Sequence, residues 1–247
     1  MDSRPIVIIG PMDSESSLLI SALENPREEH EGAYSFHIGE LYGAPAVVCR
    51  CYIGVVNSAA AAALAVSKYR PRCVILQGTA GAHDPSLHQG DIVLGERMVH
   101  LGSFYTPHRD RGEGCDPFSW DHHGTEIPSE PEREPRYLYG DSAIIKAAQS
   151  VAYQHGRVVL GTIGAADIWN RELDMIAHLH DSLGTSCEEM EGYGVAQVCS
   201  MLGVPMADIR VISNSEWYPD EEFDESVGVL CQEFVLKIIR ELNMIQP

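Results

Sequence analysis

Four short groups of acidic, glycine and amide residues follow apolar stretches of the sequence, and together they could perform acid–base chemistry on a small molecule. They occupy residues 10–15, 78–81, 188–191 and 210–214. Carboxylates can act as general bases and can accept several hydrogen bonds at once. Each group alone also has a structural explanation, because glycines are common at turns and helix dipoles favour acids in a first turn. Only the combination indicates a site.

The phosphate-binding motifs of nucleotide enzymes do not occur in the sequence. There is no G-x-x-x-x-G-K-[ST] and no G-x-G-x-x-G, which argues against nucleoside triphosphates and dinucleotides as ligands. The formal net charge of -19 disfavours nucleic acids and anionic membranes, because both are polyanions. We therefore expect no nucleic-acid partner and no membrane partner.

Short β-branched runs alternate with longer helical stretches along the chain. This alternation predicts an α/β fold with a single domain, in which helices flank a central mixed, largely parallel β-sheet. The expected strands are 5–10, 34–41, 44–52, 72–77, 90–101, 157–166 and 206–214, and the expected helices are 14–23, 57–69, 141–154, 170–183, 191–202 and 226–242. Asn57 or Ser58 is the expected N-cap of the second helix. Ligands of such folds bind at the carboxyl ends of strands, where we expect the four groups to lie.

The cysteines and the first residues bear on the compartment. The seven cysteines are scattered, form no C-x-x-C pair, and mostly lie in apolar runs, which fits the reducing cytosol. The first apolar run spans about five residues, too few for a signal peptide. No stretch approaches the ~20 apolar residues of a membrane helix. We expect a cytoplasmic protein.

Residues 102–137 differ in composition from the rest of the chain, because they are rich in Pro, Gly, His and charge. We expect a long loop or lid with little regular structure, and loops of this length are usually functional or disordered. Histidines at positions 108, 122 and 123 stand there with aspartates at 110 and 121, but no fixed metal-binding spacing supports a metal site. We expect no metal and no cofactor.

Seven motifs, taken in order, resemble the nucleoside phosphorylase and nucleosidase superfamily, with the strongest likeness to the 5'-methylthioadenosine/S-adenosylhomocysteine nucleosidases. They are IIGPMDSE at 8–15, GVVN at 54–57, QGTAG at 77–81, GDIV at 90–93, AADIW at 165–169, EEMEGYGVAQVC at 188–199 and RVISN at 210–214. The resemblance covers most of the chain. It implies a nucleoside phosphorylase-like fold and a purine-nucleoside N-glycosidase, which hydrolyses the bond between ribose and base.

The resemblance also implies roles for individual residues. Glu15 matches the carboxylate that orients and deprotonates the attacking water, and Glu191 matches the one that binds the ribose hydroxyls. Trp169 matches an aromatic position that stacks on the base, although a core tryptophan is an equally good interpretation. The other residues expected to contact or support the substrate are Met12, Thr79, Ala80, Gly81, Glu189, Met190 and Arg210, of which Thr79 matches a hydroxyl at the nucleophile site, Met190 a residue beside the ribose and Arg210 a support for Glu15 or Glu191.

The nucleophile is expected to be water. The phosphorylase branch of the superfamily holds phosphate near the first strand with glycine and arginine, whereas residues 10–18 contain no Arg or Lys. A phosphate dianion needs cations or convergent N–H groups. A purine nucleoside phosphorylase and a nucleoside-binding relative without catalysis remain the alternatives.

Asn214 departs from the family pattern. The methylthioadenosine nucleosidases carry an aspartate there, which protonates or hydrogen-bonds N7 of the leaving adenine, and an amide has no such proton to give. Either the base is a 6-oxopurine, as in a futalosine hydrolase or an inosine-cleaving enzyme, or a neighbour such as Glu216 or Asp208 supplies the acid. The sequence leaves both explanations open.

The resemblance implies a small-molecule purine nucleoside as the ligand and a homo-oligomer, with a dimer favoured, in which a neighbouring subunit helps to close the pocket. Phe104, Tyr105 and Trp120 of the long loop are expected to form walls for the substituent at the ribose 5' position.

Overall fold

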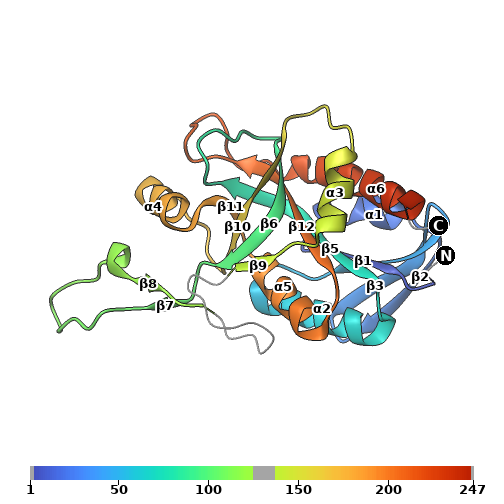
Figure 1. Cartoon of the computed structure of the whole chain (residues 1–247), viewed down its shortest axis with the longest axis horizontal. Coiled ribbons are helices and arrows are strands. Elements are labelled where there is room, and N and C mark those ends of the chain that lie inside the picture. Colours follow the sequence, from blue (N-terminus) through green and yellow to red (C-terminus); the bar gives the residue numbers. More distant parts are fainter. Residues whose placement is uncertain (1–2, 125–136, 246–247) are drawn as a thin grey trace.

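The computed structural model describes residues 3–124 and 137–245, and within them a ten-stranded sheet runs through the molecule (Figure 1). Its order is β11-β10-β6-β12-β5-β1-β4-β3-β2, with β9 paired to β6. The strands are β1 (Ile6–Gly10), β2 (Glu24–Glu31), β3 (Tyr34–Leu41), β4 (Ala44–Arg50), β5 (Cys73–Ala82), β6 (Ile92–His100), β9 (Tyr137–Tyr139), β10 (Val158–Ala165), β11 (Thr185–Glu189) and β12 (Met206–Asn214).

Helices cover both faces of this sheet (Figure 1). One face packs against α2 (Val55–Tyr69) and α5 (Gly192–Leu202), and the other against α1 (Ser17–Ser21), α3 (Ser142–Ser150) and α6 (Gly228–Ile245). The last helix, α4 (Leu173–Leu183), lies near β11. Every residue of β1 and of β12 is buried, as expected of strands between two layers of helices. The predicted α/β class is confirmed.

The sheet curls back on itself at the end that carries the site. β11 runs parallel to β10 on one side, and on the other it pairs antiparallel with β5, Glu188 standing opposite Gly81. On the far side of β5, Asn214 of β12 also stands opposite Gly81. The curl therefore brings three of the four sequence groups together at one edge.

Several boundaries differ from the sequence prediction. Residues 78–81 do not follow a strand, because β5 continues through them to Ala82. Helix α2 begins earlier than predicted, and its N-cap is Gly54 with φ of 113° rather than Asn57 or Ser58. Residues 188 and 189 are the last two residues of β11, a strand that was not predicted. Helix α5 begins after them, at Gly192. The exposed strand β2 was also missed.

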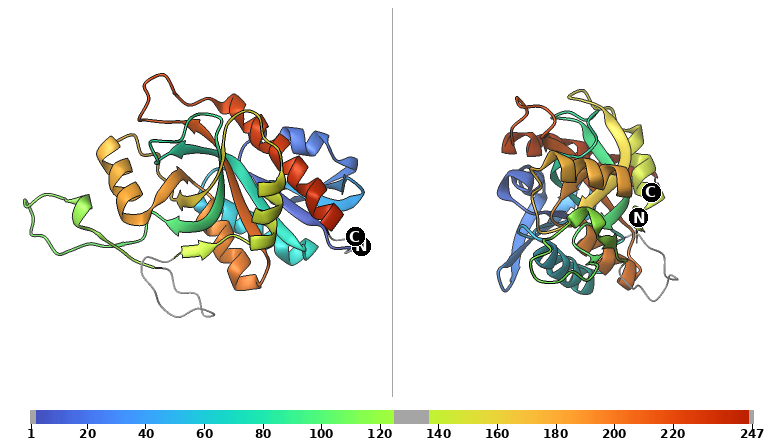
Figure 2. Two further views of the ribbon diagram at one scale, coloured as in Figure 1. Left: turned by 45° about the horizontal axis from the view of Figure 1, so that its top comes forward. Right: turned by 90° about the vertical axis from the view of Figure 1, so that its left-hand side faces the viewer.

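The described part of the predicted lid, residues 102–124, forms an arm that extends away from the sheet (Figures 1 and 2). It contains a short ribbon of β7 (Phe104–Tyr105) and β8 (Asp121–His122) and a 3₁₀ turn at Pro117–Ser119, so it has more regular structure than predicted. Phe118 of the arm packs edge-on against His178 of α4, with ring centroids 5.3 Å apart. The rest of the predicted lid, 125–136, lies outside the described residues.

None of the helices in residues 3–124 and 137–245 combines the length and the apolar character needed to cross a bilayer.

Candidate active site

An open pocket of about 630 Å³ lies where β1, β5, β11 and β12 end. All of the predicted site residues except Arg210 line it: Met12, Glu15, Thr79, Ala80, Gly81, Trp169, Glu189, Met190, Glu191 and Asn214. The pocket also takes in residues that sequence reasoning did not assign: Pro11, Ile53, Ile168, Glu188, Ser213 and Phe223.

Glu15 is fixed by hydrogen bonds at both carboxylate oxygens. The backbone N–H of Thr79 donates to its Oε1 at 2.6 Å, the Thr79 hydroxyl donates to the same atom at 2.9 Å, and the Met12 N–H donates to Oε2 at 3.1 Å. Gly78 makes this approach possible, because a Cβ there would stand 2.8 Å from Glu15 Oε1. The side chain is therefore held against β5 with its carboxylate in the pocket.

The environment of Glu15 suits a proton acceptor. Burial raises the pKa of the Glu15 carboxyl above its ordinary value, while Arg210 and the two Thr79 donors partly offset that rise. The residue is only 1% exposed. A carboxylate with a raised pKa is a stronger base than one in water and is closer to the range useful for proton transfer near neutral pH.

Glu191 is anchored at the start of α5. Its Oε1 accepts from the Gly54 N–H at 3.0 Å, and its Oε2 accepts from Arg210 Nη1 at 3.2 Å. The Ser58 hydroxyl donates to the Glu191 backbone carbonyl at 3.0 Å. Glu191 and Glu15 line the same pocket, so a ligand there can meet both carboxylates at once.

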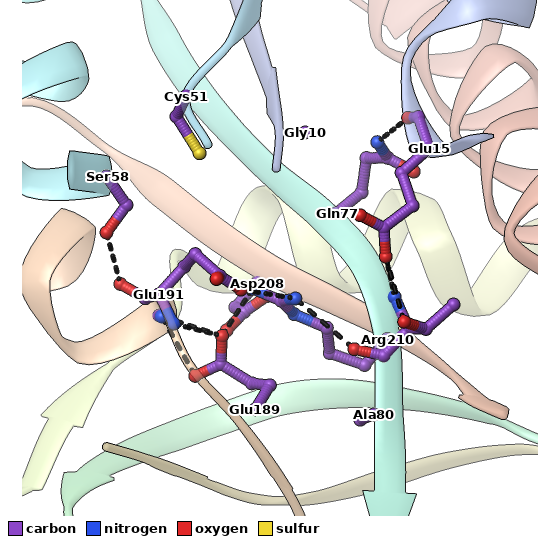
Figure 3. Close-up of polar contacts among 12 residues, drawn as sticks. Gly10, Glu15, Cys51, Ser58, Gln77, Ala80, Glu189, Glu191, Asp208 and Arg210 are labelled. Carbon is purple, nitrogen blue, oxygen red and sulfur yellow. Dashed lines mark hydrogen bonds and ion pairs between the residues drawn. The ribbon is translucent and has the colours of Figure 1, made fainter. Parts of the chain in front are cut away.

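Arg210 lies behind the pocket and holds three acids in place (Figure 3). Its Nε donates to Asp208 at 2.7 Å, Nη2 lies 2.5 Å from Glu189 Oε2, and Nη1 lies 3.2 Å from Glu191 Oε2. Burial raises the pKa of the Glu189 carboxyl well above its ordinary value, and the Arg210 charge opposes that rise. Glu189 in turn accepts from the backbone N–H groups of Glu191 and Gly192. Arg210 therefore positions the acids and does not line the pocket.

Asn214 lies in the pocket, whereas the two acids considered as its substitutes do not. Asp208 is fully buried against Arg210. Glu216 forms an ion pair with Arg171 at 3.1 Å and lines a neighbouring hollow. The suggestion that either one supplies the missing acid directly to the ligand is therefore not supported by their positions.

Trp169 is a surface residue at the mouth of the pocket. Its side chain is 54% exposed and meets Phe223 edge-on, with ring centroids 5.5 Å apart. The interpretation of Trp169 as a core tryptophan is therefore wrong. An exposed indole in this place is free to stack on a flat ligand.

The arm residues do not line this pocket. Phe104 packs against Trp120 at 5.5 Å, and Tyr105 and Trp120 border a separate hollow within the arm. The expectation that they wall the 5' side therefore fails for the pocket of the same subunit. Within residues 3–124 and 137–245, no group of three or more His, Cys, Asp or Glu is arranged to hold a metal ion.

Glu188 belongs to one of the sequence motifs, but no role was predicted for it. It lines the pocket, and His83 Nε2 lies 3.1 Å from its Oε2. His83 is buried, and its Nδ1 lies 2.8 Å from the Thr185 hydroxyl oxygen. The signal in the sequence was a third acid next to two that had been assigned, but its direction depends on β11, which had not been predicted.

A family model described as the Phosphorylase superfamily matches residues 5–242. The chain belongs to this superfamily. A 5'-methylthioadenosine/S-adenosylhomocysteine nucleosidase from Geobacillus kaustophilus is 30% identical over 94% of this chain and 95% of its own length, and one from Pseudoalteromonas translucida is 28% identical over 96% and 97%. These relatives confirm the predicted kinship with nucleosidases, which are N-glycosyl hydrolases.

A solved superfamily structure has the same architecture. The 5'-methylthioadenosine/S-adenosylhomocysteine nucleosidase from Colwellia psychrerythraea, in complex with adenine, superposes with a TM-score of 0.79 at 26% identity, covering 98% of this chain and 96% of that one. The predicted nucleoside phosphorylase-like fold is confirmed.

Proposed function

We propose that this superfamily member hydrolyses the N-glycosidic bond between ribose and a purine, as one catalytic domain. The observation that carries the proposal is the pair of buried carboxylates, Glu15 and Glu191, in one pocket with different surroundings. Glu15 is held by neutral donors and has a raised pKa, whereas Glu191 is paired with a cation. Environments that differ in this way suit one base and one ligand-binding carboxylate.

In this mechanism Glu15 takes a proton from water as the water oxygen bonds to the anomeric carbon. The bond from that carbon to the purine nitrogen breaks, and its electron pair leaves with the base. Glu191 accepts hydrogen bonds from ribose hydroxyls and stabilises the positive charge that develops on the sugar. Trp169 stacks on the base, and Met190 packs beside the ribose.

Water is the proposed nucleophile because the pocket is anionic. Among the described residues that line it are four glutamates and no Lys or Arg. The nearby Arg210 already faces three carboxylates. A phosphate dianion would enter without an available cation.

Purine release is therefore expected to proceed at the same rate with and without inorganic phosphate. The measurement is the release of free base from 5'-methylthioadenosine and inosine in phosphate-free buffer, compared with phosphate added at millimolar concentration. Ribose should appear with a free hydroxyl at the anomeric carbon. A strict requirement for phosphate, or a ribose 1-phosphate product, would identify a phosphorylase instead.

We also propose that the active form is a cytoplasmic homodimer. Six of the seven cysteines are buried and none of the seven forms a disulfide, which suits a reducing compartment. Apolar side chains stand exposed near the pocket mouth: Ile53, Val56, Ile168 and Trp169. Val56 is 75% exposed at the first turn of α2, and a second copy would cover it.

Val56→Arg is expected to convert the dimer to a monomer and to raise the KM, because a charge would have to be buried at the interface. Light scattering after gel filtration measures the mass of both proteins. Lys68→Met, on the same helix but at its far end, is the control and should remain dimeric. A monomeric wild-type protein that is fully active would contradict the proposal.

A further inference from the structure

Two polar side chains flank Gly81 at the base of the pocket. Glu188 of β11 stands opposite Gly81 on one side of β5, and Asn214 of β12 stands opposite it on the other. Neighbouring strands lie ~4.8 Å apart, so the two backbones are separated by roughly 10 Å with a glycine between them. Both side chains line the pocket, and Gly81 leaves the space between them open.

The Glu188 carboxylate presents only acceptor atoms to this space. Its Oε1 accepts from the Asn170 backbone N–H at 2.6 Å and its Oε2 from Asn170 Nδ2 at 2.5 Å, with His83 Nε2 behind Oε2. Two carboxylate oxygens offer about four lone-pair sites, so capacity remains for a donor from the ligand. These contacts also fix the side chain in place, and it is 6% exposed.

Asn214 presents a donor. Its Oδ1 faces the Ser213 hydroxyl, which donates to it at 3.0 Å. Its Nδ2 is the atom nearest to where a Cβ on Gly81 would be, at 3.2 Å. Oδ1 lies 3.6 Å from the same point and already accepts from Ser213, so the Nδ2 N–H groups are the ones left for a ligand in the space beside Gly81.

An acceptor and a donor arranged side by side match one class of purine. We propose that the base bound here is a 6-oxopurine, whose N1–H donates to Glu188 and whose O6 and N7 accept from Asn214 Nδ2. This inference rests on the proposed nucleosidase function and identifies its substrate class. It also accounts for a leaving group without a positioned acid, because the amide donor stabilises the negative charge that develops on the departing base.

Adenine has the opposite pattern at positions 1 and 6, while its N7 is an acceptor as in a 6-oxopurine. Its N1 is an acceptor and would face the Glu188 carboxylate, and its 6-amino group is a donor and would face the Asn214 amide N–H groups. Unpaired polar groups in a buried site are costly, and sites built to bond a polar group can reject an analogue lacking it by large factors. The arrangement therefore selects against 6-aminopurines.

Matched nucleosides that differ only in the base test the inference. We expect kcat/KM for 5'-methylthioinosine to exceed that for 5'-methylthioadenosine by at least about 100-fold, and 1-methylinosine to be at least about 100-fold poorer than inosine, because it lacks the N1–H. Equal or better hydrolysis of the adenine nucleosides would overturn the inference and leave the nucleosidase function intact. If none of these four nucleosides releases its base, the proposed function itself is overturned.

Variants distinguish direct recognition from a structural role. Glu188→Gln keeps the shape and supplies a donor for adenine N1, so we expect the preference for the 6-oxopurine to fall at least about tenfold. A merely structural Glu188 would lower kcat/KM for both nucleosides by the same factor, which would contradict the inference. Binding of free hypoxanthine and free adenine, measured by calorimetry on the wild-type protein, gives the same comparison without any variant.

Discussion

Replacing Glu15 with Gln is expected to lower kcat by about 10³-fold and to change the KM little. Removal of a positioned general base usually costs between 10² and 10⁴ in rate. Gln can still accept from the Thr79 donors through its amide oxygen, so the side chain should stay in place. It cannot take a proton from water. Steady-state kinetics with one nucleoside, together with calorimetric binding of the free base, separates turnover from binding.

Asp13→Asn is the matched control for Glu15→Gln. Asp13 lies on the same 3₁₀ turn but does not line the pocket. Its side chain is 77% exposed and forms an ion pair with Arg50 at 2.8 Å. The same loss of one carboxylate charge there should leave kcat within about twofold, since exposed ion pairs contribute little. Comparable turnover in Glu15→Gln and the wild type would remove Glu15 as the base.

The pH dependence of kcat/KM should also report the protonation of Glu15. Because burial raises the pKa of Glu15, kcat/KM should fall on the acidic side as that carboxyl becomes protonated, at a pH above the ordinary glutamate range. The Thr79 hydroxyl lowers this pKa, so Thr79→Val should move the acidic limb to higher pH. A limb that moves to lower pH in Thr79→Val would contradict the assignment.

Arg210→Met is expected to destabilise the fold by about 3–5 kcal/mol, which for a chain of this size lowers Tm by roughly 10 °C. Arg210 is completely buried and faces Asp208, Glu189 and Glu191. Without the guanidinium, three acids would remain in the interior with no opposing charge. Thermal unfolding followed by circular dichroism measures the loss.

Two comparisons test the electrostatic cause of the Arg210 effect. Arg27→Met removes an exposed arginine that pairs with Glu29, and it should cost less than about 1 kcal/mol. The deficit of Arg210→Met should shrink as the pH falls from 8 to 5. Burial already raises the pKa of Glu189 and of Asp208, and the loss of Arg210 raises both further. In the variant these acids therefore take up protons as the pH falls, and burying them in the neutral form costs less. A deficit that does not change with pH would indicate lost packing instead.

Apolar periodicity predicted the layers well, because β1 and β12 are buried along their whole length. The prediction failed where the conformation of a residue depends on a contact with a distant part of the chain. Gly78 suggests a turn by its intrinsic preference, yet it lies within β5 because the Glu15 carboxylate occupies the space of its missing side chain. That contact joins residues more than sixty positions apart, and no local pattern contains it.

Charged strands were the other source of error. β2 reads ENPREEHE and is mostly exposed at the end of the sheet, so no alternation of apolar residues marks it. β11 is short and ends in two glutamates, and its pairing with β5 could not be expected from the sequence. Missing β11 concealed the direction of Glu188, although the site residues assigned by resemblance, except Arg210, line the same pocket.

The double pairing of β11 has a consequence for how product leaves. β11, which carries Glu188 and Glu189, pairs with β10 on one edge and with β5 on the other. It therefore has no free edge in this part of the pocket, unlike a strand at the border of a sheet. Trp169 and Phe223, whose rings lie 5.5 Å apart, line the same pocket from connecting segments outside the sheet. We therefore expect the exit of product to depend on these two segments rather than on the strand that carries the acids.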